Sequence, residues 1–372
     1  MPILINDESK ELRKNMAQRA DQQLPEEIIG SANRRGVLLS LLGTLILVIL
    51  CNFAAKWYLN DHRPNRGYWL VKEKWEMLLG LKQPVDWLIL GDSSCNQGVV
   101  PSILNERLDV TSINLCTIGN MLSLNDAWML EKYIQQSGAP KNVLIVHVYD
   151  VWHRGINFPL IARVPLSWGY WQELEPPLKI RLRGPGILFI ERYFPLYSEN
   201  KSLSLWFRFP LDAFKEVRSY NIEEDGFMVW EKPNPSYVEA QKESHLDFAR
   251  NNQFNLSPYN RQALERIVAL AEEYGFNVYL ANSPMYEGLY EHEDFQAYFN
   301  QLQETLGAYA AKSERVHYIF REPMTFPKEQ MENADHLIYS AAKVYTNELV
   351  SEILSLQSQT TTTNHDQINI VE

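Results

Sequence analysis

The chain has 372 residues, of which 45% are hydrophobic and 22% are charged, and its formal net charge is −11. These proportions describe a folded protein and exclude both a disordered chain and a protein built mostly of membrane-spanning helices. Beyond residue 58 the chain carries 28 basic and 40 acidic side chains, a net charge of −12. Such a domain repels phosphate backbones, so we expect no nucleic-acid partner.

The N-terminal part of the sequence predicts one membrane-spanning helix. Residues 36–55 contain no charged side chain, and twenty helical residues are about 30 Å long, which matches the hydrocarbon core of a bilayer. Arg34 and Arg35 precede this stretch, and Trp57 and Tyr58 follow it, as interfacial aromatic residues do. A cleaved signal peptide fits less well, because the stretch is too long and lacks a small-residue cleavage site.

These features predict the chain's topology. Residues 1–33 would form a cytoplasmic tail, 34–58 the transmembrane helix, and the large domain would lie outside the cytoplasm. The bilayer is therefore a partner through residues 36–55.

The following residues predict an α/β domain. We expect a polar stalk and a first helix over 59–84, and the domain itself over 85–356. Short apolar runs predict five buried strands, at 87–90, 110–115, 142–148, 276–281 and 316–320. Amphipathic patterns predict helices over 123–137, from Pro258 to Gly275, and over 338–356. This alternation predicts a three-layer α/β/α fold with a mostly parallel five-stranded sheet, similar to flavodoxin.

Two segments depart from the alternation of strands and helices. Residues of about 155–254 are rich in proline and aromatic side chains, and we expect an insertion or cap over the sheet there. Residues 357–372 are rich in Gln and Thr and predict a disordered tail.

The sequence holds three cysteines and no CxxC motif, so we expect no structural zinc site. For Cys95 and Cys116 we take two small buried thiols as the default, and a disulfide as the alternative in an oxidising compartment.

Polar residues follow the predicted strands at their carboxyl ends, where parallel α/β sheets bind ligands. Gly91-Asp92-Ser93-Ser94 follows the first strand, Gly119-Asn120 the second, and Tyr149-Asp150 the third, while Asn333-Ala334-Asp335-His336 precedes the last helix. A serine at a strand-to-helix turn with a late Asp-His pair suits nucleophilic acyl transfer. The hydroxyl needs an imidazole to take its proton, and the imidazole needs a carboxyl or amide to orient it.

These motifs make the chain similar to the SGNH/GDSL hydrolase superfamily. The matching blocks are G-D-S after the first strand, N-x-x-x-x-G after the second, and D-H-L before the last helix, within residues 85–150 and 257–356. More narrowly, the chain resembles the membrane-anchored branch at cell envelopes, whose members hydrolyse or transfer O-acyl groups on polysaccharides.

The resemblance implies a role for each matching residue, and it implies no cofactor and no metal. Ser93 would be the nucleophile and an oxyanion donor, Gly119 a second oxyanion donor, and His336 the base, oriented by Asp335 or Asn333. Asn120 is our candidate to substitute for the Asn donor that the superfamily has after the third strand. Substrate contacts are assigned to Asp92, Ser94, Tyr149 and Asp150.

Three positions depart from the superfamily's pattern. Asn333 stands where an Asp is usual, Tyr149-Asp150 stand where an Asn donor is usual, and Ile338 and Ala341 replace an Asn and a Gly. The retained Ser93, Gly119 and His336 favour an esterase or O-acyltransferase acting on acylated polysaccharide. The altered positions favour the alternative, an inactive SGNH-like domain that binds glycan or partners a membrane O-acyltransferase. A third hypothesis, a glycosyltransferase, would need an acidic sugar-nucleotide motif after a strand, and we find none.

Overall fold

The computed structural model describes residues 33–61, 66–165, 169, 170, 172, 186–200, 203, 204, 208 and 221–368. The chain divides into two compact units, Met1–Trp57 and Tyr58–Glu372. The predicted cytoplasmic tail lies outside the described residues except for Asn33.

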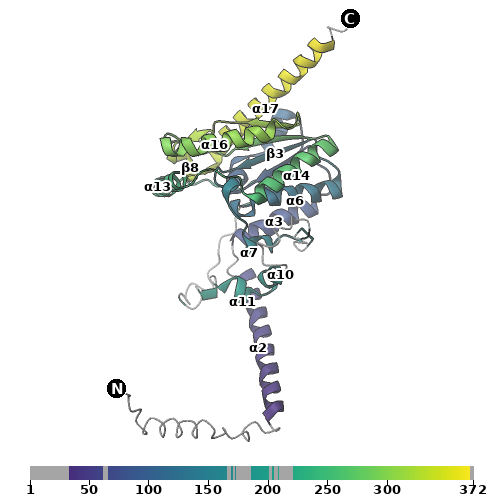
Figure 1. Ribbon diagram of the computed structural model, residues 1–372, viewed down its shortest axis with the longest axis vertical. Helices are drawn as coiled ribbons and strands as arrows, with labels where there is room; N and C mark the ends of the chain where they lie inside the picture. Colours follow the sequence, from purple (N-terminus) through teal and green to yellow (C-terminus); the bar gives the residue numbers. More distant parts are fainter. Residues whose placement is uncertain are drawn as a thin grey trace, which may run out of the picture. The chain divides into compact units, whose positions relative to one another are not determined.

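Helix α2 (Asn33–Asp61) contains the predicted membrane segment (Figure 1). Its stretch Arg35–Leu59 is long and apolar enough to cross a bilayer, as a membrane anchor or a signal sequence would be. Large apolar side chains such as Leu39 and Phe53 are exposed, as side chains that face lipid are. The single apolar N-terminal helix is therefore confirmed, and its orientation stays a prediction. Helix α2 runs on to Asp61, so the stalk that we expected from residue 59 starts as helix.

A five-stranded parallel sheet forms the centre of the second unit. Its strands are β1 (Trp87–Gly91), β2 (Ser112–Asn114), β3 (Asn142–His147), β4 (Asn277–Asn282) and β6 (Val316–Ile319), in the order β2-β1-β3-β4-β6. Every residue of β1 is buried, which explains its apolar sequence. Strand β2 is also buried throughout, although it contains Ser112 and Asn114, whose side chains are hydrogen-bonded. The predicted α/β class and all five strands are confirmed.

Helices cover the sheet. Helix α6 packs on α14, and α17 packs on α4 and α5; in Figure 1, α17 and the α6–α14 pair lie on opposite sides of β3. The helices of this unit that flank the sheet are α3 (Arg66–Gly80), α4 (Ser93–Gly98), α5 (Pro101–Leu108), α6 (Leu122–Ser137), α14 (Pro258–Tyr274), α16 (Glu293–Ala310) and α17 (Tyr339–Ile368).

Local sequence signals explain where two of these helices end. Ser257 caps α14 by accepting a hydrogen bond from the Asn260 N–H, and Gly275 ends that helix at a φ of 78°. Helix α17 continues past Leu356 to Ile368, where we expected a disordered tail. No Gly or Pro lies between Tyr339 and Ile368, so nothing in the sequence forces an earlier end.

The remaining elements complete the described structure. They are η2 (Gly119–Met121), η3 (Val151–His153), α7 (Phe158–Ile161), α10 (Gly186–Tyr193), α11 (Pro195–Ser198), α13 (Pro235–Asn251), β5 (Met285–Tyr286), α15 (Glu287–Tyr290), β7 (Thr325–Phe326), η5 (Lys328–Gln330), β8 (Met331–Asn333) and β9 (His336–Leu337). The described parts of the predicted cap contain the helices α7, α10, α11 and α13, and a non-helical segment, 221–234, with an isolated bridge between Ile222 and Met228. A covering role for residues 155–254 stays a prediction.

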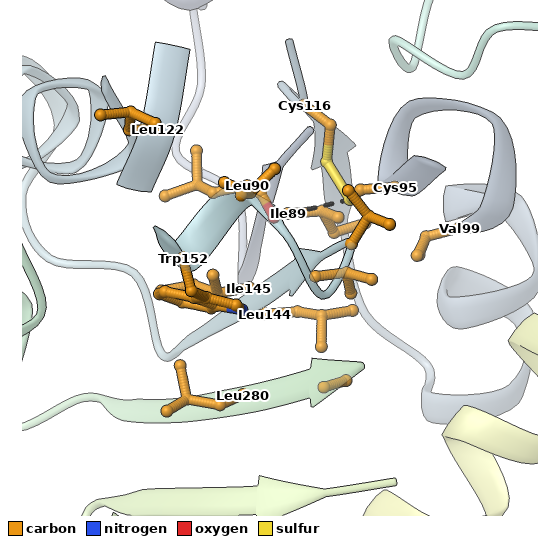
Figure 2. Packing of buried hydrophobic residues seen from close by; sticks show 14 of the residues in the cluster. Ile89, Leu90, Cys95, Val99, Cys116, Leu122, Leu144, Ile145, Trp152 and Leu280 are labelled. Atoms are coloured by element: carbon orange, nitrogen blue, oxygen red, sulfur yellow. Dashed lines mark hydrogen bonds between the residues drawn. A yellow bond between two sulfur atoms is a disulfide. The ribbon is translucent and has the colours of Figure 1, made fainter. Parts of the chain in front are cut away.

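A disulfide joins Cys95 in α4 to Cys116 after β2 (Figure 2). The default expectation of two free thiols is therefore wrong. The two cysteines follow the carboxyl ends of β1 and β2, which pair side by side, and their Cα atoms are 5.9 Å apart. The pairing of the two strands, which the sequence does not reveal, brings the cysteines together.

Candidate functional site

The turn between β1 and α4 is organised by the buried carboxylate of Asp92. Its Oδ1 accepts hydrogen bonds from Ser94 N at 2.9 Å and Ser94 Oγ at 2.5 Å, and its Oδ2 accepts one from Val148 N at 2.7 Å. Asp92 is therefore the N-cap of α4 and also ties β3 to the turn. Asp92 and Ser94 are fully buried and already occupied by these hydrogen bonds, which argues against the predicted substrate contacts of both residues.

A buried imidazole lies beside this carboxylate. His147 Nε2 is 2.6 Å from Asp126 Oδ2, and His147 Nδ1 is 3.6 Å from Asp92 Oδ2, with all three side chains about 1% exposed. Burial lowers the pKa of His147, but the charges of Asp126 and Asp92 outweigh this and raise the pKa to about 9. Burial in turn raises the pKa of Asp92, and the bonds and charge of His147 offset this and hold the pKa well below its usual range.

The candidate base, His336, is held by two oxygens. Its Nδ1 lies 2.6 Å from Asp335 Oδ1 and 2.7 Å from Asn333 Oδ1. The short hairpin of β8 and β9 brings these three residues together. With Nδ1 occupied, Nε2 is the nitrogen left to exchange a proton with a substrate or a serine.

The serine and the histidine come from neighbouring elements. Helix α4, which begins at Ser93, packs against β9, which begins at His336. Ser93 is partly exposed, and within the described part of the chain its Oγ makes no hydrogen bond to His336. Catalytic hydrogen bonds are often long or poorly aligned before substrate binds, so the absence of this bond is compatible with a catalytic pair.

The loop after β2 and the segment after β3 meet at the same turn. Thr117 N donates to Gly91 O at 2.9 Å, which places Gly119 and Asn120 close to the serine turn. Asp150 holds the guanidinium of Arg154, with Nη2 2.8 Å and 2.6 Å from its two carboxylate oxygens. Tyr149, which we assigned to substrate, is buried, and its hydroxyl lies 2.7 Å from His245 Nδ1. Burial argues against direct substrate contact for this residue too.

Several residues of this site were missed in the sequence. Arg154 directly precedes the predicted cap of about 155–254, and His245 lies within it. Asp126 lies in α6 and His147 in β3, a helix and a strand whose sequences predict packing elements. The local signal for His147 is an ionisable residue inside an otherwise apolar strand, which indicates a buried polar partner.

A separate groove of about 690 Å³ lies between α6 and α14, with Trp128, Leu270 and Tyr274 among its lining residues. It contains none of the candidate site residues, and we do not place the chemistry there.

No known protein family and no curated protein matches this chain. Among solved structures it is similar to one provisionally described as a platelet activating factor from Streptococcus pneumonia. The two share 11% sequence identity and a TM-score of 0.36, over 81% of this chain and 97% of the other. A similarity at this level assigns neither a family nor an activity.

Proposed function

We propose that the chain is a membrane-anchored esterase or O-acyltransferase of the SGNH type, acting on acyl esters of an envelope or extracellular polysaccharide. The observation that carries the proposal is His336, whose Nδ1 is held by Asp335 and Asn333 on an element that packs against the helix begun by Ser93. The polysaccharide itself rests on the sequence resemblance alone.

The proposed reaction passes through an acyl-enzyme. Ser93 Oγ attacks the ester carbonyl carbon while its proton moves to His336 Nε2, and the alcohol leaves with that proton as the carbon–oxygen bond breaks. Water then releases the acyl group as an acid, or a glycan hydroxyl accepts it. His336 takes the proton of the incoming group and returns it to Ser93 Oγ as the bond between Oγ and the acyl group breaks. Asp335 and Asn333 keep the imidazole in the tautomer that exposes Nε2.

The disulfide supports the location of this reaction outside the cytoplasm. Disulfides persist in oxidising compartments and are rare in reducing ones. Cys95 and Cys116 are both buried and joined, which agrees with an extracytoplasmic second unit.

Labelling with a fluorophosphonate probe tests the proposal on the full chain in detergent. We expect labelling of the wild type that is abolished in Ser93→Ala and His336→Ala. Ser102→Ala, an exposed serine on the next helix, is the matched control and should label normally.

One observation favours a second candidate, a non-catalytic domain that binds glycan or a membrane acyltransferase: Ser93 Oγ does not reach His336 by a hydrogen bond in the described structure. A folded wild type that is not labelled on Ser93 would support this second candidate over the first.

A further inference from the structure

Arg154 is held in one orientation by a neighbouring carboxylate. Its Nη2 contacts both oxygens of Asp150, at 2.8 Å and 2.6 Å, and its Nε lies 3.2 Å from Asp150 Oδ2. A guanidinium bound through Nε and Nη2 is fixed in plane, because this is the two-point geometry that a carboxylate matches. The remaining nitrogen, Nη1, therefore has a defined direction.

Nη1 points at the loop that follows β2. It lies 3.5 Å from Asn120 Oδ1, a weak contact that leaves donor capacity unused. A Cβ at Gly119 would lie 2.6 Å from this same nitrogen and 2.8 Å from Val151 Cγ2, so a larger residue there would have to displace the guanidinium or Val151. The side chain of Arg154 is 33% exposed, so a bound substrate can reach it.

Two hydrogen bonds anchor this arrangement to the serine turn. Thr117, which is two residues before Gly119, donates its N–H to Gly91 O. Val148, which is two residues before Asp150, donates its N–H to Asp92 Oδ2. The negative charges of Asp150, Asp92 and Asp335 raise the pKa of Arg154 against the opposing effect of burial. The guanidinium is thus a permanent cation that interacts electrostatically with Asp92, the residue before Ser93, and with Asp335, the residue before His336.

We propose that Nη1 of Arg154 donates a hydrogen bond to the carbonyl oxygen of the substrate ester as that oxygen gains negative charge. This inference rests on the proposed function and deepens it. In this arrangement Arg154 is a catalytic residue, Asp150 is a positioning residue, and Gly119 provides the space. A fixed charged donor at a developing oxyanion stabilises the transition state more than the ground state, because the ester carbonyl carries only partial charge.

The saturable kinetics of fluorophosphonate labelling on the full chain in detergent test this inference. The phosphoryl oxygen of the probe occupies the position of the ester oxyanion. We compare the wild type with Arg154→Gln and Arg154→Lys. Arg250→Gln is the matched control, because Arg250 is an exposed arginine that also pairs with carboxylates, those of Asp247 and Asp294. Thermal unfolding of each variant is measured alongside.

We expect Arg154→Gln to lower the maximal labelling rate about 10²- to 10³-fold, the range for loss of one oxyanion donor, with little change in half-saturating probe concentration. Arg154→Lys should retain an intermediate rate, since it keeps the charge and loses the fixed geometry. Arg250→Gln should label like the wild type. A purely structural role would instead lower the unfolding temperature and affect both kinetic parameters.

The outcomes separate the two claims. If the wild type labels on Ser93 and Arg154→Gln labels within about twofold of it, a change of less than 0.5 kcal/mol, the role of Arg154 is refuted and the proposed function stands. If folded wild type does not label on Ser93, the proposed function fails, and the role of Arg154 fails with it.

Discussion

Nδ1 of His336 contacts two side-chain oxygens, those of Asp335 and Asn333. The charges around the imidazole determine the pH range in which it can serve as a general base. Burial lowers the pKa of His336, but the carboxylates of Asp335, Glu332 and Asp92 outweigh burial and raise the pKa above its ordinary value of 6.5. Because a general base must be neutral, activity is lost as pH falls through this raised pKa.

We therefore expect the acidic limb of the labelling rate to have its midpoint above pH 6.5. Removing the nearest charge in Asp335→Asn should move that midpoint to lower pH. The same change should lower the maximal rate by about 10²-fold, less than the roughly 10⁴-fold loss known for a triad carboxylate, because Asn333 still holds Nδ1. The rate of fluorophosphonate labelling against pH checks both effects, and a wild-type midpoint at or below 6.5 would contradict them.

The protonation of His147 affects the stability of the fold, and we assign it no role in catalysis. The pKa of His147 is raised from 6.5 to about 9 in the folded protein, so the folded state holds its proton more tightly than the unfolded state does. Its contribution to stability is fully present below about pH 6.5 and is lost as pH rises through about 9.

The difference in free energy of unfolding between the wild type and His147→Asn should therefore shrink as pH rises from 6.5 to 9. Burial lowers the pKa of Lys74 to about 7, so Lys74 makes the free energy of unfolding rise with pH, opposite to the effect of His147. The difference between the wild type and His147→Asn cancels this effect of Lys74, which both proteins share. Urea unfolding at several pH values provides the measurement. A difference that stays constant over this range would mean that His147 is neutral in the folded protein.

At the scale of elements, the β1–α4 turn depends on the absence of a side chain at Gly91. A Cβ there would lie 2.0 Å from Val146 O, and φ is 146°. Gly91→Ala must therefore push β1 away from β3, and we expect a loss of more than about 2 kcal/mol of unfolding free energy. Gly138→Ala is the control, because Gly138 also has a positive φ, 83°, but nothing lies within 4 Å of its Cβ position. Equal losses in the two variants, measured by urea unfolding, would show that the close approach to β3 is not the cause.

The disulfide links two more elements, α4 and the loop after β2. Its cysteines are 21 residues apart in sequence, and closing a loop of this size in the unfolded chain stabilises the fold by about 3 kcal/mol. We expect the double variant Cys95→Ala/Cys116→Ala to lose about that amount in urea unfolding. Cys51→Ala, which removes the exposed free cysteine, should leave the unfolding of the second unit unchanged. A double variant as stable as the wild type would show that the bond is absent or makes no contribution.

At the scale of the whole molecule, we predict that the chain crosses the membrane once, and its orientation there would decide which substrates the second unit meets. Introduced cysteines in a Cys51→Ser background can be labelled with a membrane-impermeant maleimide on intact cells. We expect Ser102→Cys, on an exposed position of α5, to react on intact cells, and Ser9→Cys in the N-terminal tail to react only after lysis. The reverse pattern would place the candidate site in the cytoplasm and remove the envelope polysaccharide from consideration.

Much of this protein could be predicted from local sequence. The apolar stretch of residues 36–55 predicts a helix long and apolar enough to span a bilayer, because length and the absence of charge can be read directly from the sequence. The strands other than β2 lie in mostly apolar and buried stretches of the sequence, and α14 carries its start and stop signals in Ser257 and Gly275. The serine turn and the late Asp-His pair are also local patterns, so their residues could be named in advance, although their catalytic roles stay a prediction.

Only the tertiary structure determines which residues distant in the sequence contact one another. The order β2-β1-β3-β4-β6 brings Cys95 to Cys116, Asp92 to Val148, and Asp126 to His147, residues 21 to 56 positions apart in the chain. The same packing buried Asp92, Ser94 and Tyr149 and directed Arg154 at Gly119. The physical reason is that hydrophobic periodicity and turn residues indicate structure over only a few neighbouring positions. Strand pairing depends instead on which arrangement buries the apolar faces of the whole sheet.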